Sequence, residues 1–167
     1  MTASNALPDQ DAVISEIEIA APPERVFQAL TDQKQLFHWW GKEPSVELTV
    51  FEMDAHKGGK YRYACTPRSA GDFGAVAEQM KKSKASAFEC HGEVLEYDPP
   101  RLLVWSWIAN WHEQPDHATT VRWELTRTAT GTRVRVTHSG LRNEPISRKD
   151  YGQGWEGVLR LLEQYFR

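Results

Sequence analysis

The sequence predicts a single α+β domain in which helices cover one side of an antiparallel β-sheet. Its length of 167 residues suits one domain, since domains commonly hold about 100 to 200 residues. Short segments of alternating apolar and polar residues run through most of the chain, and this period of two is typical of half-buried strands. The last segment instead repeats apolar residues every three or four positions, which predicts a long amphipathic helix. Such a helix needs an apolar partner, and the sheet provides one.

The chain is expected to begin with a strand and two short helices. Residues 13–19 alternate as a half-buried strand does. A proline in the first turn of a helix costs no hydrogen bond, so the prolines that follow predict a helix that begins near Pro23. Residues 32–40 predict a second short helix, which ends at Gly41.

Six further strands are expected in the middle of the chain. They are residues 46–53, 60–65, 88–97, 102–108, 121–125 and 133–137. Glycine and proline turns separate most of them, which predicts consecutive antiparallel hairpins. Residues 66–85 interrupt the pattern with glycines, a proline and several lysines, and we expect a long loop insertion there.

The final helix is expected to start near Ser147 and to lie on the sheet. Its apolar stripe consists of Tyr151, Trp155, Val158, Leu159, Leu162 and Phe166. A strongly bent sheet of seven strands cannot press every residue against one helix, so a space opens between them unless large side chains fill it. The sequence therefore predicts either a cavity or an aromatic plug between the sheet and this helix.

Composition and charge exclude several classes of protein. Lys and Arg number 20 and Asp and Glu 23, a net charge of −3, which argues against a nucleic-acid partner. No apolar run approaches the roughly 18 residues of a membrane span. The two cysteines are too few for a disulfide framework and lack zinc spacing. Residues 1–12 are expected to form a loose tail without signal-peptide features, so we expect a cytoplasmic protein.

Several stretches of the sequence resemble one known family. They are residues 35–41 (QLFHWWG), residues 92–102 (GEVLEYDPPRL), residues 137–140 (THSG) and the Gly154-Trp155 pair in the final helix. They resemble the family of the Hsp90-ATPase activator homologue domain, in the START-like, helix-grip (Bet v 1-like, SRPBCC) superfamily. The resemblance implies a curved seven-stranded sheet that grips the long helix around an apolar cavity. Members of this superfamily include lipid and hormone binders, polyketide cyclases and chaperone partners.

The candidate ligand-binding residues are the large aromatic side chains expected between the sheet and the last helix, together with one histidine. They are Trp39, Trp40, Tyr63, Phe88, Trp105, Trp107, Trp123, His138 and Trp155. Aromatic walls with a few polar tips are typical of small-molecule pockets. The alternative interpretation of each tryptophan is ordinary core packing, and Trp111 is expected in a loop.

His138 is the catalytic candidate, because it lies on the inward face at the end of a strand and could shuttle a proton. A structural histidine is the alternative, since the sequence fixes no nucleophile or base beside it. His91 and Glu93 share a strand face that we expect to be the outer one. No dinucleotide, P-loop, serine-hydrolase or metal motif is present, so no cofactor and no metal are expected.

Three functional hypotheses follow from the sequence. The first is a binding module that holds a small hydrophobic or amphipathic ligand in the cavity. The second is an enzyme that acts on such a ligand by cyclase-like proton transfer, with His138 as acid or base. The third is an interaction protein that binds an Hsp90-type chaperone. An exposed edge strand, either the first one or the one near Val46, could pair two subunits, so both a monomer and a homodimer remain open.

Overall fold

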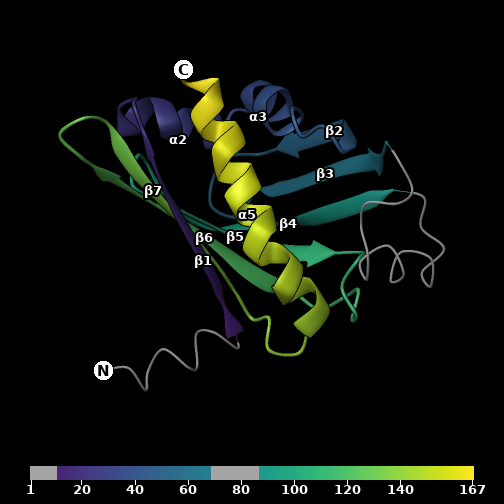
Figure 1. Ribbon diagram of the computed structural model, residues 1–167. Coiled ribbons are helices and arrows are strands. Elements are labelled where there is room, and N and C mark those ends of the chain that lie inside the picture. The colour runs from purple at the N-terminus through teal and green to yellow at the C-terminus, as the bar shows by residue number, and fades with distance from the viewer. Residues whose placement is uncertain (1–10, 69–86) are drawn as a thin grey trace.

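The computed structural model describes residues 11–68 and 87–167. A curved seven-stranded antiparallel sheet surrounds one long helix that crosses its concave face, and two short helices follow the first strand (Figure 1). This is the helix-grip arrangement, so the predicted fold class is confirmed. No helix in the described ranges is both long enough and apolar enough to cross a membrane.

The observed elements agree closely with those predicted. In chain order they are β1 (Val13–Ile19), α2 (Pro23–Thr31), α3 (Gln33–Trp40), β2 (Val46–Met53), β3 (Lys60–Pro67), β4 (Phe88–Asp98), β5 (Leu102–Ala109), β6 (Thr119–Arg127), β7 (Thr132–Ser139) and α5 (Pro145–Tyr165). The helix α5 begins two residues before the predicted Ser147. Pro145 occupies its first turn, where the missing N–H of a proline costs no hydrogen bond.

The strands form one meander to which β1 is added. Their order is β1-β7-β6-β5-β4-β3-β2, so the two strands proposed as exposed edges, β1 and β2, are the two edges of the sheet. Register shifts in β2 between Leu48 and Val50 and in β4 between Val94 and Glu96 mark irregularities of the kind that bend a sheet. The curvature leaves room for α5 on one side.

Gly92 allows close packing within the sheet. A Cβ atom at this position would lie 2.0 Å from the main-chain oxygen of Ser106, and Tyr61 covers the same spot. The Tyr61 hydroxyl donates to that oxygen at 2.7 Å. No residue other than glycine fits here without moving the backbone.

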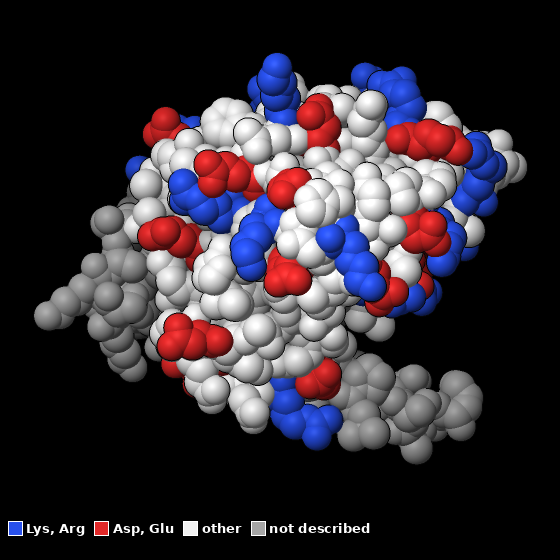
Figure 2. Space-filling model, turned by 180° about the vertical axis from the view of Figure 1, so that it is seen from behind, with Lys and Arg blue, Asp and Glu red and all other residues white. Residues whose placement is uncertain are grey.

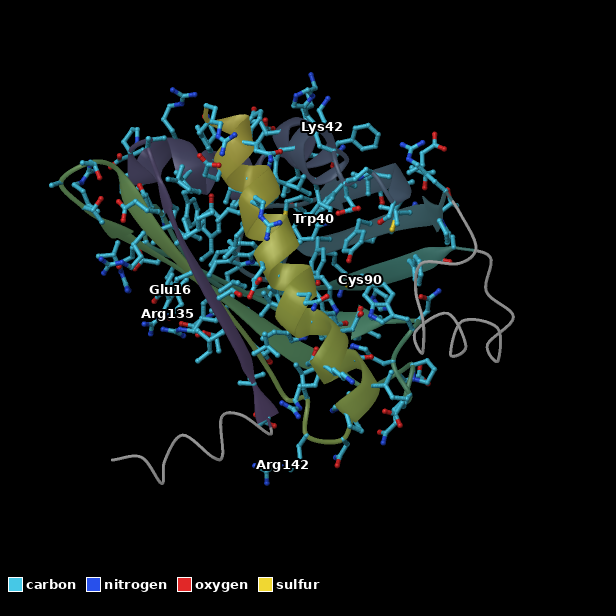
Figure 3. All side chains as sticks on the ribbon, viewed as in Figure 1. Glu16, Trp40, Lys42, Cys90, Arg135 and Arg142 are labelled. Atoms are coloured by element: carbon cyan, nitrogen blue, oxygen red, sulfur yellow. The ribbon has the colours of Figure 1, made fainter. Side chains whose placement is uncertain are left out.

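The two faces of the sheet differ in character. The concave face is apolar, and Trp40 lies between it and α5, whereas Glu16 and Arg135 lie on the outer face (Figure 3). Arg135 Nε donates to Glu16 at 2.5 Å, and Arg62 pairs with Glu52 at 2.6 Å. Figure 2 shows that acidic and basic side chains are intermixed over the outer surface. Such a surface favours solvent over a polyanionic partner.

Two of the predicted segments fall largely outside the described residues. These are the tail at 1–12, of which only residues 11 and 12 are described, and the insertion at 66–85, of which residues 66–68 are described. Asp11 is bonded to the fold, since its main-chain oxygen accepts from Leu141 N at 2.8 Å and its side chain accepts from Gly140 N at 3.1 Å. Strand β3 continues to Pro67, so it includes the first two residues assigned to the insertion.

Candidate functional site

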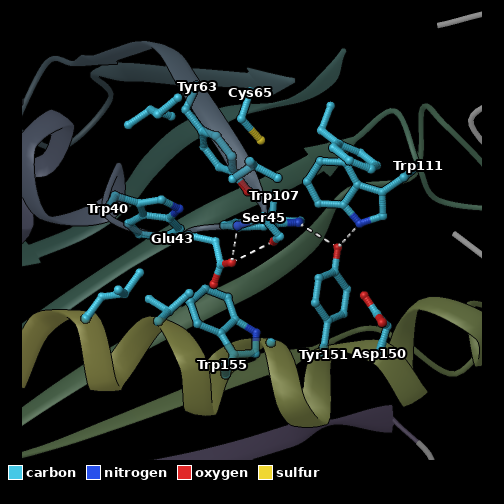
Figure 4. A pocket seen from close by; sticks show the side chains of 16 residues that line it. Trp40, Glu43, Ser45, Tyr63, Cys65, Trp107, Trp111, Asp150, Tyr151 and Trp155 are labelled. Atoms are coloured by element: carbon cyan, nitrogen blue, oxygen red, sulfur yellow. Dashed lines mark hydrogen bonds between the residues drawn. The ribbon is translucent and has the colours of Figure 1, made fainter. Parts of the chain in front are cut away.

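A cavity of about 220 Å³ lies between α5, the strands β3 to β5 and the connection from α3 to β2 (Figure 4). We call it the aromatic cavity. It is lined by Trp40, Glu43, Ser45, Val46, Leu48, Tyr63, Cys65, Phe88, Trp107, Trp111, Asp150, Tyr151, Gly154, Trp155, Val158 and Leu161. Seven of these side chains are aromatic, and they come from six different elements and loops. The aromatic cavity is thus assembled by the tertiary fold.

A second hollow of about 710 Å³ lies on the outer surface beside α3 and β2. Its wall carries charged groups such as Lys34, Lys42 and Glu47. Because binding sites for small molecules are mostly apolar with few polar groups, the aromatic cavity is the better candidate.

The hydroxyl of Tyr151 anchors one side of the aromatic cavity. It accepts hydrogen bonds from the indole N–H of Trp107 at 3.0 Å and of Trp111 at 2.9 Å (Figure 4). Its oxygen also lies 2.7 Å from His112 Nε2. Indole nitrogens can only donate, so they occupy the two acceptor positions, and the Tyr151 proton must point to His112. Burial raises the pKa of Tyr151 well above its usual value.

This arrangement fixes the tautomer of His112. Its Nε2 must be bare to accept from Tyr151, so the proton of the neutral ring is on Nδ1, which is buried and has no hydrogen-bond partner among the described residues. Burial, helped by the charge of His117, lowers the pKa of His112 to about 4. The imidazole is therefore neutral at physiological pH and serves to orient Tyr151.

The start of α5 holds the loop that carries Trp111 and His112. Glu144, the residue before the helix, is fully buried, and its carboxylate accepts from Glu113 N at 2.6 Å and from Gln114 N at 3.1 Å. Charge-assisted bonds of this kind are stronger than neutral ones. The Glu144 carboxylate thus fixes the loop against the start of α5 and keeps Trp111 within reach of Tyr151.

We call one part of the more exposed wall the mouth, and it consists of Glu43, Ser45, Asp150 and Gly154. The half-buried apolar residues Val46, Val158 and Leu161 form the rest of that wall. Glu43 Oε1 accepts from the Ser45 amide at 2.8 Å and from the Ser45 hydroxyl at 2.6 Å. Burial raises the pKa of Asp150. The mouth is therefore the place where polar and charged groups of a ligand would meet the protein.

Cys65 lines the aromatic cavity but is not activated. Burial, and to a smaller degree the Glu43 carboxylate, raises the pKa of its thiol to about 12. A thiol of this kind is protonated at neutral pH and is a poor nucleophile. Within the described ranges, no three metal-ligating side chains lie close enough together to hold a metal ion.

His138 lies behind the aromatic cavity and is not among its lining residues. It is fully buried, and its Nδ1 accepts from the indole N–H of Trp155 at 3.1 Å. Its Nε2 therefore carries the proton and donates to Thr119 Oγ1 at 2.7 Å, and Thr119 in turn donates to the oxygen of Trp107 at 3.1 Å. Burial lowers the pKa of His138 well below its usual value. These contacts favour the structural role.

The structure brings together five of the candidate residues: Trp40, Tyr63, Phe88, Trp107 and Trp155 line the aromatic cavity. The other tryptophans, Trp39, Trp105 and Trp123, are fully buried in the core and do not line it. Trp39 donates to the oxygen of Ala29 at 2.8 Å, and Trp105 stacks on Tyr61 with ring centroids 4.7 Å apart.

Sequence reasoning missed Trp111, Tyr151 and both carboxylates of the mouth. Trp111 is in a turn, as expected, yet its ring folds back onto the cavity. Tyr151 was part of the apolar stripe of the last helix, and its hydroxyl was the signal that one end of this side chain needs polar partners. His91 is exposed and Glu93 half-buried, as the assignment to the outer face predicts.

Comparisons with known proteins agree with this fold. The family model described as "Activator of Hsp90 ATPase homolog 1-like protein" matches residues 20–167. Protein MLL2253 from Mesorhizobium loti is a solved structure with 25% identity and a TM-score of 0.65, and the match covers 92% of this chain and 94% of that one. No curated protein matches the sequence.

Two further solved structures show the same fold at lower identity. Protein CV1439 from Chromobacterium violaceum has 20% identity and a TM-score of 0.71, with 93% of this chain and 97% of that chain covered. The AHSA1-like protein from Aeromonas hydrophila has 17% identity and a TM-score of 0.65, with 92% and 90% covered. Each spans nearly the whole chain, so the fold is common to all of them.

Proposed function

The chain belongs to the family of Activator of Hsp90 ATPase homolog 1-like proteins, and from this premise we propose that it binds a small hydrophobic or amphipathic molecule in the aromatic cavity. The family and its fold support a ligand-binding domain in general terms. The observation that carries the finer proposal is the cavity itself. It is a space of about 220 Å³ walled by seven aromatic side chains, between the sheet and α5.

The size of the aromatic cavity limits the ligand. An engineered apolar cavity of about 150 Å³ holds benzene, and pockets for drug-sized ligands usually measure about 300 to 1,000 Å³. A cavity of about 220 Å³ therefore suits one ring with a short side chain. Burial of apolar surface would supply the affinity at about 25 cal/mol per Å² before the costs of association.

Polar groups of the wall would orient such a ligand. The Tyr63 hydroxyl makes no hydrogen bond with any of the described residues, and its oxygen points into the cavity (Figure 4). The indole N–H groups of Trp107, Trp111 and Trp155 are already engaged by the protein. Tyr63, the indole N–H of Trp40 and the mouth are thus the groups with hydrogen-bonding capacity left for a guest.

A binding experiment with 2-phenylethanol tests this proposal. Tryptophan emission and NMR chemical shifts are followed during titration, and we expect saturable binding with a Kd on the order of 0.1 to 1 mM for so small a ligand. Native mass spectrometry of freshly purified protein would in addition reveal a resident small molecule. Absence of saturable binding by both spectroscopic readouts would refute the proposal for ligands of this size.

Two glycines of α5 provide a matched pair of variants. Gly154 lines the aromatic cavity and Gly152 does not, while a Cβ atom at either position would meet no atom within 4 Å. Both Gly154→Leu and Gly152→Leu increase helix propensity, so both should fold. We expect Gly154→Leu to weaken 2-phenylethanol binding and Gly152→Leu to leave it unchanged.

The proposal does not include catalysis by His138, because partners engage both of its ring nitrogens and it lies outside the cavity wall. Binding to an Hsp90-type chaperone stays a separate hypothesis that the family description alone suggests. An ATPase assay with the purified chaperone would test it, with stimulation as the supporting result.

A further inference from the structure

The charged groups that line the aromatic cavity are all acidic. They are Glu43 and Asp150, and no Lys, Arg or His is among the described residues of the wall. Arg148 and Lys149 precede Asp150 in α5, but neither lines the cavity. A ligand that enters past the mouth therefore meets two carboxylates in the wall itself. The nearby Arg68 guanidinium is outside the wall, and its Nε donates to the oxygen of Val46 at 3.1 Å.

Both carboxylates keep unused binding capacity. Asp150 has no hydrogen bond and no ion pair with any residue in 11–68 or 87–167, and burial without a compensating charge raises its pKa. Glu43 uses only Oε1 to hold Ser45, which leaves Oε2 without a partner in the same ranges. A partly desolvated carboxylate without a partner is stabilised by a cation that comes close to it.

The aromatic walls favour the same sign of charge. The face of an aromatic ring is negative, so indole and phenol rings attract a cation that lies over them, and tryptophan does so best. Trp40, Trp107, Trp111 and Trp155 all contribute to the wall. Aromatic cages of this composition recognise ammonium groups. An anionic ligand would meet both the ring faces and the carboxylates with unfavourable electrostatics.

We propose that the preferred ligand of the aromatic cavity carries a protonated amine on an apolar body about the size of one ring, with the amine at the mouth, where the carboxylates of Asp150 and Glu43 make the wall negative. This inference rests on the proposed function, since it names the class of ligand for the same site. It distinguishes amines from the neutral and anionic molecules that the volume alone would also admit.

Three ligands of one shape test the charge preference. These are 2-phenylethylamine, 2-phenylethanol and 3-phenylpropionate, which share a phenyl ring and a two-carbon chain and differ in charge. Calorimetry at neutral pH and low salt should show the amine bound about tenfold more tightly than the alcohol, which corresponds to about 1.4 kcal/mol. The propionate should bind more weakly than the alcohol. Added salt should reduce the difference, because the mouth is solvent-accessible.

The double variant Glu43→Gln, Asp150→Asn tests the assigned residues. Both substitutions keep the shape, and the carbonyl oxygen of the glutamine side chain can still accept from Ser45. We expect the double variant to lose most of the tenfold preference for the amine over the alcohol, because only the aromatic walls then favour the cation. Glu156→Gln is the control, since Glu156 is an exposed acid of α5 that does not line the cavity, and it should keep the tenfold preference.

The outcomes separate this inference from the proposed function. If the alcohol binds and the amine binds no more tightly, the charge preference is refuted and the binding cavity stands. If the double variant keeps the full preference for the amine, the assignment of Glu43 and Asp150 is refuted. If none of the three ligands binds, the proposed function fails as well.

Discussion

Acid should destabilise this protein through His112, the buried imidazole behind the aromatic cavity. Its bare Nε2 accepts from the Tyr151 hydroxyl at 2.7 Å. Protonation would place a second donor on that bond, and it would put a charge on a side chain that is only 2% exposed. Burial accordingly lowers the pKa of His112 from 6.5 to about 4. In the unfolded chain the imidazole is exposed to water, so it takes up a proton near its ordinary pKa of about 6.5.

The sign and size of the effect follow from proton linkage. Between pH 6.5 and about 4 the unfolded chain binds more protons than the folded protein, so the free energy of unfolding falls as the pH falls. The stability is fully present above pH 6.5 and is lost as the pH decreases toward 4. From about pH 7 to about pH 5, His112 alone should lower the free energy of unfolding by about 2 kcal/mol. Burial lowers the pKa of His138 as well, so it acts in the same direction.

Urea unfolding of the native protein and His112→Gln at about pH 7 and about pH 5 measures this contribution. The glutamine carbonyl can accept from Tyr151 but does not titrate, so the loss of stability between the two pH values should be about 2 kcal/mol smaller in the variant. His91→Gln is the control, because it removes an imidazole that is exposed on β4. Equal losses in the native protein and in His112→Gln would refute the assigned tautomer and burial effect.

Three further changes test hydrogen bonding and packing in the fold. Tyr151→Phe removes the partner of three buried polar groups, and at about 1 kcal/mol for each group the free energy of unfolding in urea should fall by about 3 kcal/mol. A loss below about 1 kcal/mol would contradict the hydrogen-bond assignment. Gly157→Ala should raise the free energy of unfolding by up to about 1 kcal/mol, because alanine has the higher helix propensity and its Cβ atom would contact no atom within 4 Å. Gly92→Ala should lower the melting temperature instead, since its Cβ would lie 2.0 Å from Ser106 O, and a higher melting temperature would contradict this.

The strands and helices could be predicted because each places its apolar residues, at the period of that element, on the one face that packs against the core. In β6 and β7, Val121, Trp123 and Val136 are inward-facing and fully buried, as their period of two predicts. The helix α5 could be predicted for the same reason, with a period near 3.6 in place of two. Periodicity reports which face a residue occupies, and this was sufficient for the fold.

The candidate site could be predicted only in part, because periodicity does not tell whether an inward-facing residue lines the cavity or packs in the core. Trp105 and Trp107 share one face of β5, yet Trp107 lines the aromatic cavity and Trp105 packs against Tyr61. The difference depends on where α5 crosses the sheet, and that crossing is set by the curvature of all seven strands together. Trp111 was missed for a related reason, since a turn residue has no periodic pattern from which its direction could be read.

The sequence left open whether a cavity or an aromatic plug separates the sheet from α5, and the structure contains both. Trp105, Trp123 and Trp155 fill one part, with Trp123 and Trp155 edge to face at 5.6 Å. The other part stays open as the aromatic cavity of about 220 Å³. Hydrogen bonds explain why the rings do not collapse into it. His138 holds the indole of Trp155, and Tyr151 holds those of Trp107 and Trp111, so closure of the cavity would leave buried donors unpaired.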